Sequence, residues 1–354
     1  MEDSVSSKQR KPAAKPAAPH PVNLKQLAAY LGLNPATVSV VLNDVPGRSI
    51  PQATRDRIKA AAREMNYQPS QLARSLRSRR TLTIGVLVPE LGDGYHSEVL
   101  SGIGDQLINA GYFYFTAHHR HRKNLVEDYT RMLISRGAQG IIAIDTELEH
   151  PIPIPVVAIA GHRHIKGVTN VILDHVRASE LTLNHLYALG HRQIAFMHGQ
   201  PSSTDAETRW TAIMAVAKRL NLVIKQELTV NLARDMTSPE LGYPVIKQLL
   251  AAKLPFTALV AFNDVSAIGS IRALQDFNLR VPADVSVIGF DDIQAASYNT
   301  PRLTTIRQPL AEMGRIATQS LLNFIHGTIA PREEIAVEPE LIVRESTGPA
   351  RLTS

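Results

Sequence analysis

The segment from Val22 to Leu42 constrains the fold of this chain more than any other part. Leu24, Leu27, Ala28 and Leu31 recur at positions i, i+3, i+4 and i+7. This spacing places all four side chains on one face of a helix. The segment therefore begins with a short amphipathic helix whose apolar face must be covered by another element.

A tight turn and a second helix follow. Gly32 is expected to end the first helix. Asn34 can cap the next helix with its side-chain oxygen, and Pro35 suits the first helical position, where no N–H is needed. The buried stripe of the second helix is Val38, Val41 and Leu42, and a third helix must supply Ile58, Ala61, Ala62 and Met65 to complete a core. Residues 22–68 are therefore predicted to be a helix-turn-helix domain, with the second helix aimed at the major groove of DNA.

Charge is distributed unevenly along the chain. Residues 1–80 hold 14 Lys and Arg against 5 Asp and Glu, a net charge of +9, whereas the whole chain carries +6 and the remainder therefore −3. A basic head on a mildly acidic body is typical of nucleic-acid binders, although a solvated basic surface without a partner would look the same. Residues 1–21, rich in Pro, Ala and Lys, are expected to be a disordered tail.

Residues 69–80 are predicted to form a hinge helix or linker. Pro69 ends the preceding helix, and the next stretch places Leu72 and Leu76 among arginines. An isolated helix of about 10 residues is marginal in water, so this one would fold only against something else. Apolar wedges with basic neighbours suit insertion into the minor groove; the alternative is an ordinary flexible linker.

After residue 80 the sequence alternates between apolar runs and helical stretches. Leu82–Val88, Gly140–Ile144 and Val156–Ile159 have the texture of strands buried on both faces. Helical stretches such as Asp205–Leu220 and Leu310–Ile325 alternate with the strands. The pattern predicts two doubly wound α/β lobes with parallel sheets and a ligand at the strand C-termini. We expect lobe 1 at about 81–176 and 308–330, lobe 2 at about 177–307 and 331–346, and a tail at 347–354.

At this point the chain resembles the lactose-repressor/galactose-repressor (LacI/GalR) family of bacterial transcription regulators over roughly residues 22–346. The matching motifs are L-K-Q-L-A-A-Y-L-G-L-N-P-A-T-V-S (24–39), A-R-S-L (73–76), I-G-V-L-V-P (84–89), L-G-H-R-Q-I-A (189–195), A-F-N-D (261–264), V-P-A-D-V-S-V-I-G-F-D-D (281–292) and P-R-L-T-T-I-R-Q-P (301–309). The resemblance implies a DNA-binding head on a periplasmic-binding-protein-like body that dimerises, binds palindromic operators and responds to a small metabolite.

The resemblance also implies which residues touch DNA. These are Pro35, Ala36, Thr37, Ser39, Val40, Arg48, Arg74 and Leu76. Pro35 and Ala36 cannot donate bidentate hydrogen bonds to bases, so direct readout by the second helix is expected to be poor. We therefore hypothesise that much of the specificity depends on DNA deformability where Leu76 enters the minor groove. Leu76→Ala should then reduce discrimination between operator and scrambled duplexes more than Ala36→Gly does.

For the ligand cleft, the resemblance implies Tyr95, His96, Arg209, Asn263 and Asp291. A few polar groups beside an aromatic wall can orient and stack a polyol such as a sugar. The alternatives are that Asp291 caps the following helix and that Arg209 is an ordinary surface charge.

This chain also departs from its relatives in the cleft. Ile144 and Ile159 stand where many of them carry Asp or Asn, and Ser203 and Asp205 stand near where some carry Arg and Thr. A ligand with hydroxyls all round would then lack partners on the first-lobe side. Either the ligand is less polar there, or neighbours such as Asp145 or His162 supply the contacts.

Other motifs give weaker signals. In His118-His119-Arg120-His121 the arginine would repel a cation and no acidic residue is interleaved, so a solvated loop is favoured over a metal site. Gly102-Ile103-Gly104 lies inside a helical stretch and is expected to serve packing instead of a dinucleotide. The chain has no Walker loop, G-x-S-x-G, H-E-x-x-H or cysteine. No metal, cofactor or catalytic residue is therefore expected.

These observations predict a cytoplasmic transcriptional regulator, a repressor, that acts as a homodimer on double-stranded DNA under control of a small-molecule effector. No signal sequence or membrane span is expected from the N-terminus and the apolar runs. The dimer surfaces would be the helix from Tyr95 and the helix Leu310–Ile325, unless these belong to the core. A solute-binding protein and a sugar or nucleotide enzyme remain as alternatives.

Overall fold

The computed structural model of the 354-residue chain describes residues 22–44, 48–68, 80–92, 94–161, 164–232, 241–328 and 332–351. It divides into two compact units, one ending at Thr81 and the other beginning at Leu82. Within the described ranges, no helix is long and apolar enough to cross a membrane.

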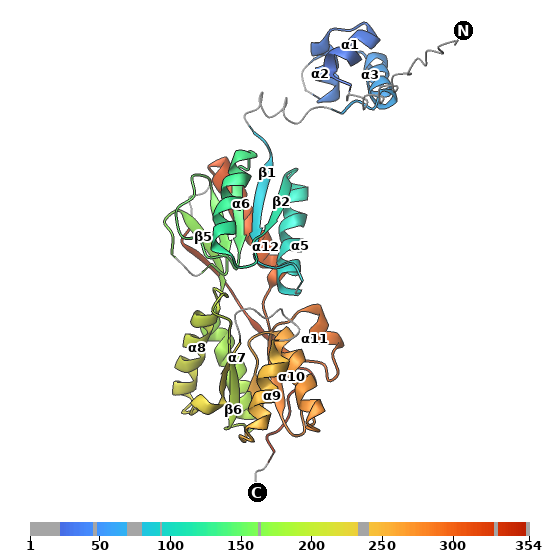
Figure 1. The fold of residues 1–354 in the computed structure, drawn as a ribbon. Helices are drawn as coiled ribbons and strands as arrows, with labels where there is room; N and C mark the ends of the chain where they lie inside the picture. The colour runs from blue at the N-terminus through green and yellow to red at the C-terminus, as the bar shows by residue number, and fades with distance from the viewer. Residues whose placement is uncertain are drawn as a thin grey trace, which may run out of the picture. The chain divides into compact units, whose positions relative to one another are not determined.

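The described residues of the first unit form the helices α1 (Leu24–Leu31), α2 (Pro35–Leu42) and α3 (Gln52–Glu64) (Figure 1). Gly32 ends α1 in the left-handed conformation, with φ 64°, and Asn34 caps α2 by accepting a 2.8 Å hydrogen bond from the Ala36 N–H. Pro35 is the first residue of α2. The predicted turn chemistry is therefore confirmed.

The core of this unit joins all three helices. Its buried side chains are Leu27, Ala28, Val38, Val41, Ile58, Ala61 and Ala62. Met65, Leu24, Leu31 and Leu42 pack around them at the edge. Each helix is too short to be stable alone, so this shared apolar contact holds the unit together.

The first lobe of the second unit is a six-stranded sheet in the order β11-β5-β4-β3-β1-β2, with every pair parallel. Its elements are β1 (Thr83–Val88), α5 (Gly94–Asn109), β2 (Phe113–His118), α6 (Lys123–Ser135), β3 (Gly140–Ile144), β4 (Val156–Ile159), β5 (Val168–Leu173), α12 (Leu310–His326) and β11 (Glu334–Val337). Side chains of α5 and α12 pack on one face of the sheet and those of α6 on the other. The continuous apolar runs of β1, β3 and β4 are explained by this burial on both faces.

The second lobe repeats this layered plan with the strand order β12-β10-β9-β8-β6-β7. Its elements are α7 (His175–Ala188), β6 (Ile194–His198), α8 (Ala206–Arg219), η1 (Gln226–Leu228), β7 (Thr229–Asn231), α9 (Gly242–Ala251), β8 (Ala258–Val260), α10 (Asp264–Asp276), β9 (Ser286–Asp291), α11 (Gln294–Tyr298), β10 (Thr304–Arg307) and β12 (Glu340–Ile342). Helices α7 and α8 cover one face, and α9 and α10 the other. Only the β10–β12 pair is antiparallel among the strands described.

Two predicted boundaries are wrong. Residues 331–346 do not all belong to lobe 2, because β11 pairs with β5 in the first sheet before β12 joins the second. Residues 347–351 are not a free tail. The Ala350 N–H donates to the Leu189 carbonyl, and Arg351 forms a 3.2 Å ion pair with Asp284. These residues are part of the second lobe.

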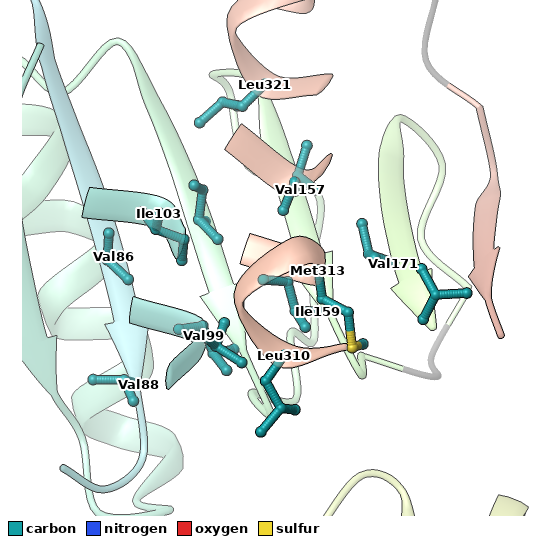
Figure 2. Close-up of a cluster of buried hydrophobic side chains, with 14 of the residues drawn as sticks. Val86, Val88, Val99, Ile103, Val157, Ile159, Val171, Leu310, Met313 and Leu321 are labelled. Atoms are coloured by element: carbon teal, nitrogen blue, oxygen red, sulfur yellow. The ribbon is translucent and has the colours of Figure 1, made fainter. Parts of the chain in front are cut away.

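Close packing of α5 on α12 forms the centre of the first lobe. Leu310, Met313 and Leu321 of α12 face residues of α5 and of the sheet (Figure 2). A Cβ added to Gly102 would lie 1.9 Å from the Ala311 carbonyl oxygen, so the helices approach too closely for any other residue there. Gly102 thus serves packing, as predicted, and the apolar stripe of α12 is core.

Candidate functional site

The exposed face of α2 lies at its N-terminal turn. Pro35 and Ala36 are exposed, while Thr37, Ser39 and Val40 are partly buried beside the core residues Val38 and Val41. The five predicted contact residues of α2 thus reach solvent with small side chains. Such a surface can approach DNA closely but offers bases few hydrogen-bond donors.

The first unit also exposes several basic side chains. Arg48 is exposed, as are Lys25, Arg57 and Arg63 of the same unit. Exposed cations of this kind bind phosphate oxygens and position a protein on a duplex without reading its sequence. The predicted contacts Arg74 and Leu76, with the rest of residues 69–79, lie outside the described residues.

In the second unit, one pocket gathers residues that follow the carboxyl ends of strands in both lobes. Its lining is Glu90, Tyr95, His96, His121, Asp145, Gln200, Ser203, Asp205, Arg209, Leu241, Phe262, Asn263 and Asp291. It encloses about 590 Å³ of space between atoms, part of it open to solvent. All five predicted cleft residues line this pocket, at the position where doubly wound proteins bind ligands.

Arg209 is the most deeply held cation of the pocket. Only 7% of its surface is exposed, and its guanidinium carbon lies 3.7 Å from the Phe290 ring centre and 4.5 Å from that of Phe262. Its Nη atoms donate to the Phe262 carbonyl at 2.5 Å and to Asp205 Oδ2 at 3.1 Å. The idea that Arg209 is an ordinary surface charge is therefore wrong, because such a buried guanidinium is fixed in place.

Asp291 lies at the end of β9 with φ 116°, a conformation that non-glycine residues rarely adopt. It accepts a 2.7 Å hydrogen bond from Gln308 Nε2. It does not cap the following helix, because Ile293 is the N-cap of α11. Asn263 does have a structural role, since its Oδ1 caps α10 by accepting from the Ser266 N–H at 2.9 Å. Asn263 nevertheless lines the pocket.

Tyr95 and His96 begin α5 and form the first-lobe wall. Their rings meet edge to face with centres 5.0 Å apart. The Tyr95 hydroxyl is buried and has no hydrogen-bond partner among the described residues. Burial raises its pKa well above 10, and repulsion by Asp205, Asp145 and Asp291 raises it further. The phenol therefore remains protonated and can donate to a ligand.

Asp145 provides the polar group that Ile144 and Ile159 lack. Ile144 and Ile159 are fully buried in the core, whereas Asp145 follows β3 directly and lines the pocket. Its Oδ1 accepts from both the N–H and the hydroxyl of Thr204, at 2.9 and 2.7 Å. These bonds join the two lobes beside the pocket. The other suggested neighbour, His162, lies outside the described residues.

The His118–His121 segment is not simply a solvated loop. His119 is buried and bonds to Thr146 Oγ1 at 2.9 Å. Burial, with nearby His121, His118 and His96, lowers the pKa of His119 to about 3, so it stays neutral. His121 lines the pocket.

Sequence reasoning missed five lining residues, namely Glu90, His121, Gln200, Leu241 and Phe262. A signal existed for four of them. Glu90, His121, Gln200 and Phe262 each follow within three residues of the end of a parallel strand. Polar or aromatic residues at such positions are candidates for ligand contact.

Comparisons with known proteins agree with this architecture. Residues 23–70 match the family described as "Bacterial regulatory proteins, lacI family", and residues 183–347 match the "Periplasmic binding protein-like domain". The HTH-type transcriptional repressor PurR of Haemophilus influenzae is 32% identical over 336 residues, covering 91% of this chain and 98% of its own. The chain belongs to the lacI family of bacterial regulatory proteins. The predicted fold class, and the prediction that the protein is a regulator and not an enzyme, are confirmed.

Other lacI-family proteins give the same result. PurR of Erwinia tasmaniensis is 30% identical over 339 residues, covering 93% of this chain and 98% of its own. The structure of the Lac repressor dimer bound to operator and the anti-inducer ONPF has a TM-score of 0.82 at 26% identity, covering 93% of this chain and all of that one. A LacI family transcriptional regulator from Enterococcus faecium with bound ribose has a TM-score of 0.68 at 25% identity, covering 76% of this chain and all of that one.

Proposed function

We propose that this lacI-family protein is a transcriptional repressor whose operator affinity is set by a small molecule in the pocket between its lobes. The observation that carries the proposal is one chain holding both an exposed helix-turn-helix with basic neighbours and a pocket lined from two lobes. The N-terminal unit would bind DNA and the pocket would bind the effector. Action on chromosomal DNA implies a cytoplasmic location.

The DNA-binding residues follow from the exposed turn of α2. Pro35 and Ala36 would approach base edges, Val40 a thymine methyl, and Thr37 and Ser39 phosphate oxygens. Arg48 would bind phosphate or a base. Arg74 and Leu76 would hold and widen the minor groove at the centre of a palindromic operator.

Binding to a palindrome requires a second copy of the chain. Helix α12 is core, but the edge strand β2 leaves two aromatic rings in solvent, with Phe113 62% and Phe115 42% exposed. Ile108, at the end of the neighbouring helix α5, is also exposed. Exposed apolar side chains along a sheet edge favour association. We therefore assign the homodimer contact to β2 and α5, and Phe115→Asp should yield a monomer in sedimentation.

Regulation would operate by linkage between the two sites. An effector that contacts both lobes favours one lobe arrangement, and that arrangement changes the separation of the two heads in a dimer. Such coupling is typically about 1–3 kcal/mol and is reciprocal between the sites. A solute-binding protein without a DNA role is disfavoured by the N-terminal unit.

Operator binding provides the test. A duplex selected from a random library should bind the full chain with an affinity that falls steeply with salt, by about 10³–10⁵ between 50 and 200 mM. Ala36→Glu, which adds negative charge on the exposed turn of α2, should abolish this binding. Val223→Glu, at a position 77% exposed in the second unit, is the matched control and should leave it unchanged. Failure to select any duplex would contradict the proposal.

A further inference from the structure

Acidic side chains outnumber basic ones among the described residues that line the pocket. Among the described lining residues, four are carboxylates, namely Glu90, Asp145, Asp205 and Asp291, and one, Arg209, is a fixed cation. Counting only these carboxylates and Arg209, the described lining has a formal charge of −3. Such a pocket repels anions and attracts cations.

Arg209 does not offset this charge for a ligand. Its Nη atoms already bind Asp205 and the Phe262 carbonyl, and its guanidinium is stacked between two rings. Asp205 also lies 3.3 Å from the Nε2 atom of His175. The Asp205–Arg209 pair is thus internally compensated, and the net negative charge that a ligand meets comes from the other carboxylates.

Two of those carboxylates are on the first-lobe wall. β1 and β3 are parallel neighbours with Leu87 opposite Ala143, so Glu90 and Asp145 follow adjacent strand ends. Glu90 forms no hydrogen bond or ion pair with the described residues. Both bonds from Thr204 reach Oδ1 of Asp145, while its Oδ2 lies 3.9 Å from the nearest cationic candidate, His96 Nε2. Each carboxylate therefore keeps acceptor capacity for a donor that enters the pocket.

Two buried polar atoms in the same pocket also lack partners. The Tyr95 hydroxyl and the Nε atom of Arg209 have no hydrogen-bond partner among the described residues. Buried polar groups are normally satisfied, so a polar ligand that reaches Tyr95 and Arg209 would meet unused hydrogen-bonding capacity there. The Tyr95 oxygen can accept from a ligand N–H and donate to a ligand hydroxyl, whereas Arg209 Nε can only donate.

A bare metal ion does not fit this arrangement. Among the described residues, the only group of three or more His, Asp or Glu ligand atoms within 4.8 Å of one another is Glu127, Glu149 and His150, outside the pocket lining. The negative charge of the pocket is instead spread over carboxylates that follow several different strands, an arrangement that favours an organic cation over a bare ion.

We propose that the effector is a hydroxylated small molecule bearing a positively charged nitrogen, held by Glu90 and Asp145 on the first-lobe wall. Its hydroxyls would meet Arg209, Asn263 and Asp291 on the second lobe. A charge-assisted hydrogen bond is about twice as strong as a neutral one, so the charged nitrogen determines selectivity against uncharged analogues. The inference rests on the proposed function only in naming this ligand an effector.

The test measures binding to the full chain by calorimetry and thermal shift. The probes are D-glucosamine and D-galactosamine, each beside its neutral parent hexose, its neutral N-acetyl derivative and the anionic 6-phosphate of that parent hexose, together with a set of hydroxylated amines and their uncharged counterparts. At least one cation should bind about tenfold or more tightly than its neutral counterpart, and the phosphates should not bind.

Three variants locate the charged nitrogen. Glu90→Gln and Asp145→Asn should each reduce the preference for the amine by about tenfold, while binding of a neutral counterpart changes little. Asparagine keeps the oxygen that accepts from Thr204, so the contact between the lobes is retained. Glu147→Gln is the control, because Glu147 is exposed, lies outside the pocket lining and pairs with Lys123 at 3.5 Å.

Tighter binding of neutral or anionic probes, or no binding by any amine, would overturn the inference. So would an unchanged preference in both Glu90→Gln and Asp145→Asn. Operator binding measured on the same preparation separates this outcome from failure of the proposed function. A protein that binds its operator but not amines would refute the ligand class alone.

Discussion

At the scale of single residues, the pocket depends on charged side chains that their neighbours hold in one position. Arg209 is held by one carboxylate, one carbonyl and two aromatic rings. Asp291 is held by Gln308 in an uncommon backbone conformation. These groups are in place before a ligand arrives, so little ordering free energy is lost on binding.

Arg209→Lys tests this preorganisation. Lysine keeps the charge but cannot stack as a plane or donate in two fixed directions. We expect ligand affinity to fall about tenfold or more, with operator binding of the ligand-free protein retained. Arg219→Lys is the control, because Arg219 lies on the same helix and forms an exposed ion pair with Glu180. Equal effects of the two variants in calorimetry would argue against a ligand role for Arg209.

Asp264 gives the fold a pH dependence opposite in sign to that of most carboxylates. It is fully buried and accepts from the Thr305 hydroxyl at 2.5 Å and from the Ile293 N–H at 2.9 Å. Burial raises its pKa from 3.8 to about 7, with a smaller rise from Asp292, and the two hydrogen bonds oppose this. Folded Asp264 therefore holds a proton that the unfolded chain releases near pH 4.

Because the pKa of Asp264 is higher in the folded chain than in the unfolded chain, Asp264 contributes to the free energy of unfolding below about pH 4. This contribution is lost as the pH rises to about 7. Asp264→Asn has no titratable group at this position, so its free energy of unfolding lacks this dependence on pH. The variant also loses one of the two hydrogen-bond acceptors. The Tm of the wild type should exceed that of Asp264→Asn by more at pH 5 than at pH 7.5. A Tm difference that is the same at both pH values would contradict the raised pKa.

At the scale of elements, the sequence pattern predicted those helix and strand ends that are determined by neighbouring residues. Asn34 and Pro35 start α2 because their capping preferences act within one turn, and β3 and β4 begin and end as predicted because both are continuous apolar runs. β10 was missed because it has only four residues, three of them Thr or Arg. Residues 331–346 were all placed in lobe 2 because β5, the partner of β11, lies far away in sequence, and no local pattern records that pairing.

The contact of α5 with α12 provides a test at this scale. Gly102→Ala would place a Cβ 1.9 Å from the Ala311 carbonyl, so the two helices must move apart. Such overpacking costs about 1–3 kcal/mol or more. Gly92→Ala is the control, because a Cβ there meets nothing within 4 Å. A lowered Tm only for Gly102→Ala is expected in thermal unfolding, and equal Tm values would contradict the close packing.

At the scale of the whole molecule, the second unit brings strand ends of two lobes to one pocket. Tyr95, Arg209 and Asp291 could be assigned to the cleft from family resemblance, and the pocket includes all three. Their effector role remains a prediction. Glu90 lies in no motif, and the histidine run that contains His121 was interpreted as a solvated loop. Only their place after a strand shows that they reach the pocket.

Asp145 and Thr204 join the lobes directly beside this pocket, and Gly94 packs against Ile293 at another point of contact between them. A ligand that changes these contacts would alter the lobe arrangement as a whole. Regulation would therefore depend on the relation between the lobes and not on any single residue.

The most direct test of this account is the affinity of the full chain for its selected operator, measured by anisotropy over increasing concentrations of a ligand shown by calorimetry to bind the pocket. The account predicts that a saturating ligand changes the operator Kd by about 5–150-fold, and that saturating operator changes the ligand Kd by the same factor. An operator Kd that stays constant at every ligand concentration would contradict it.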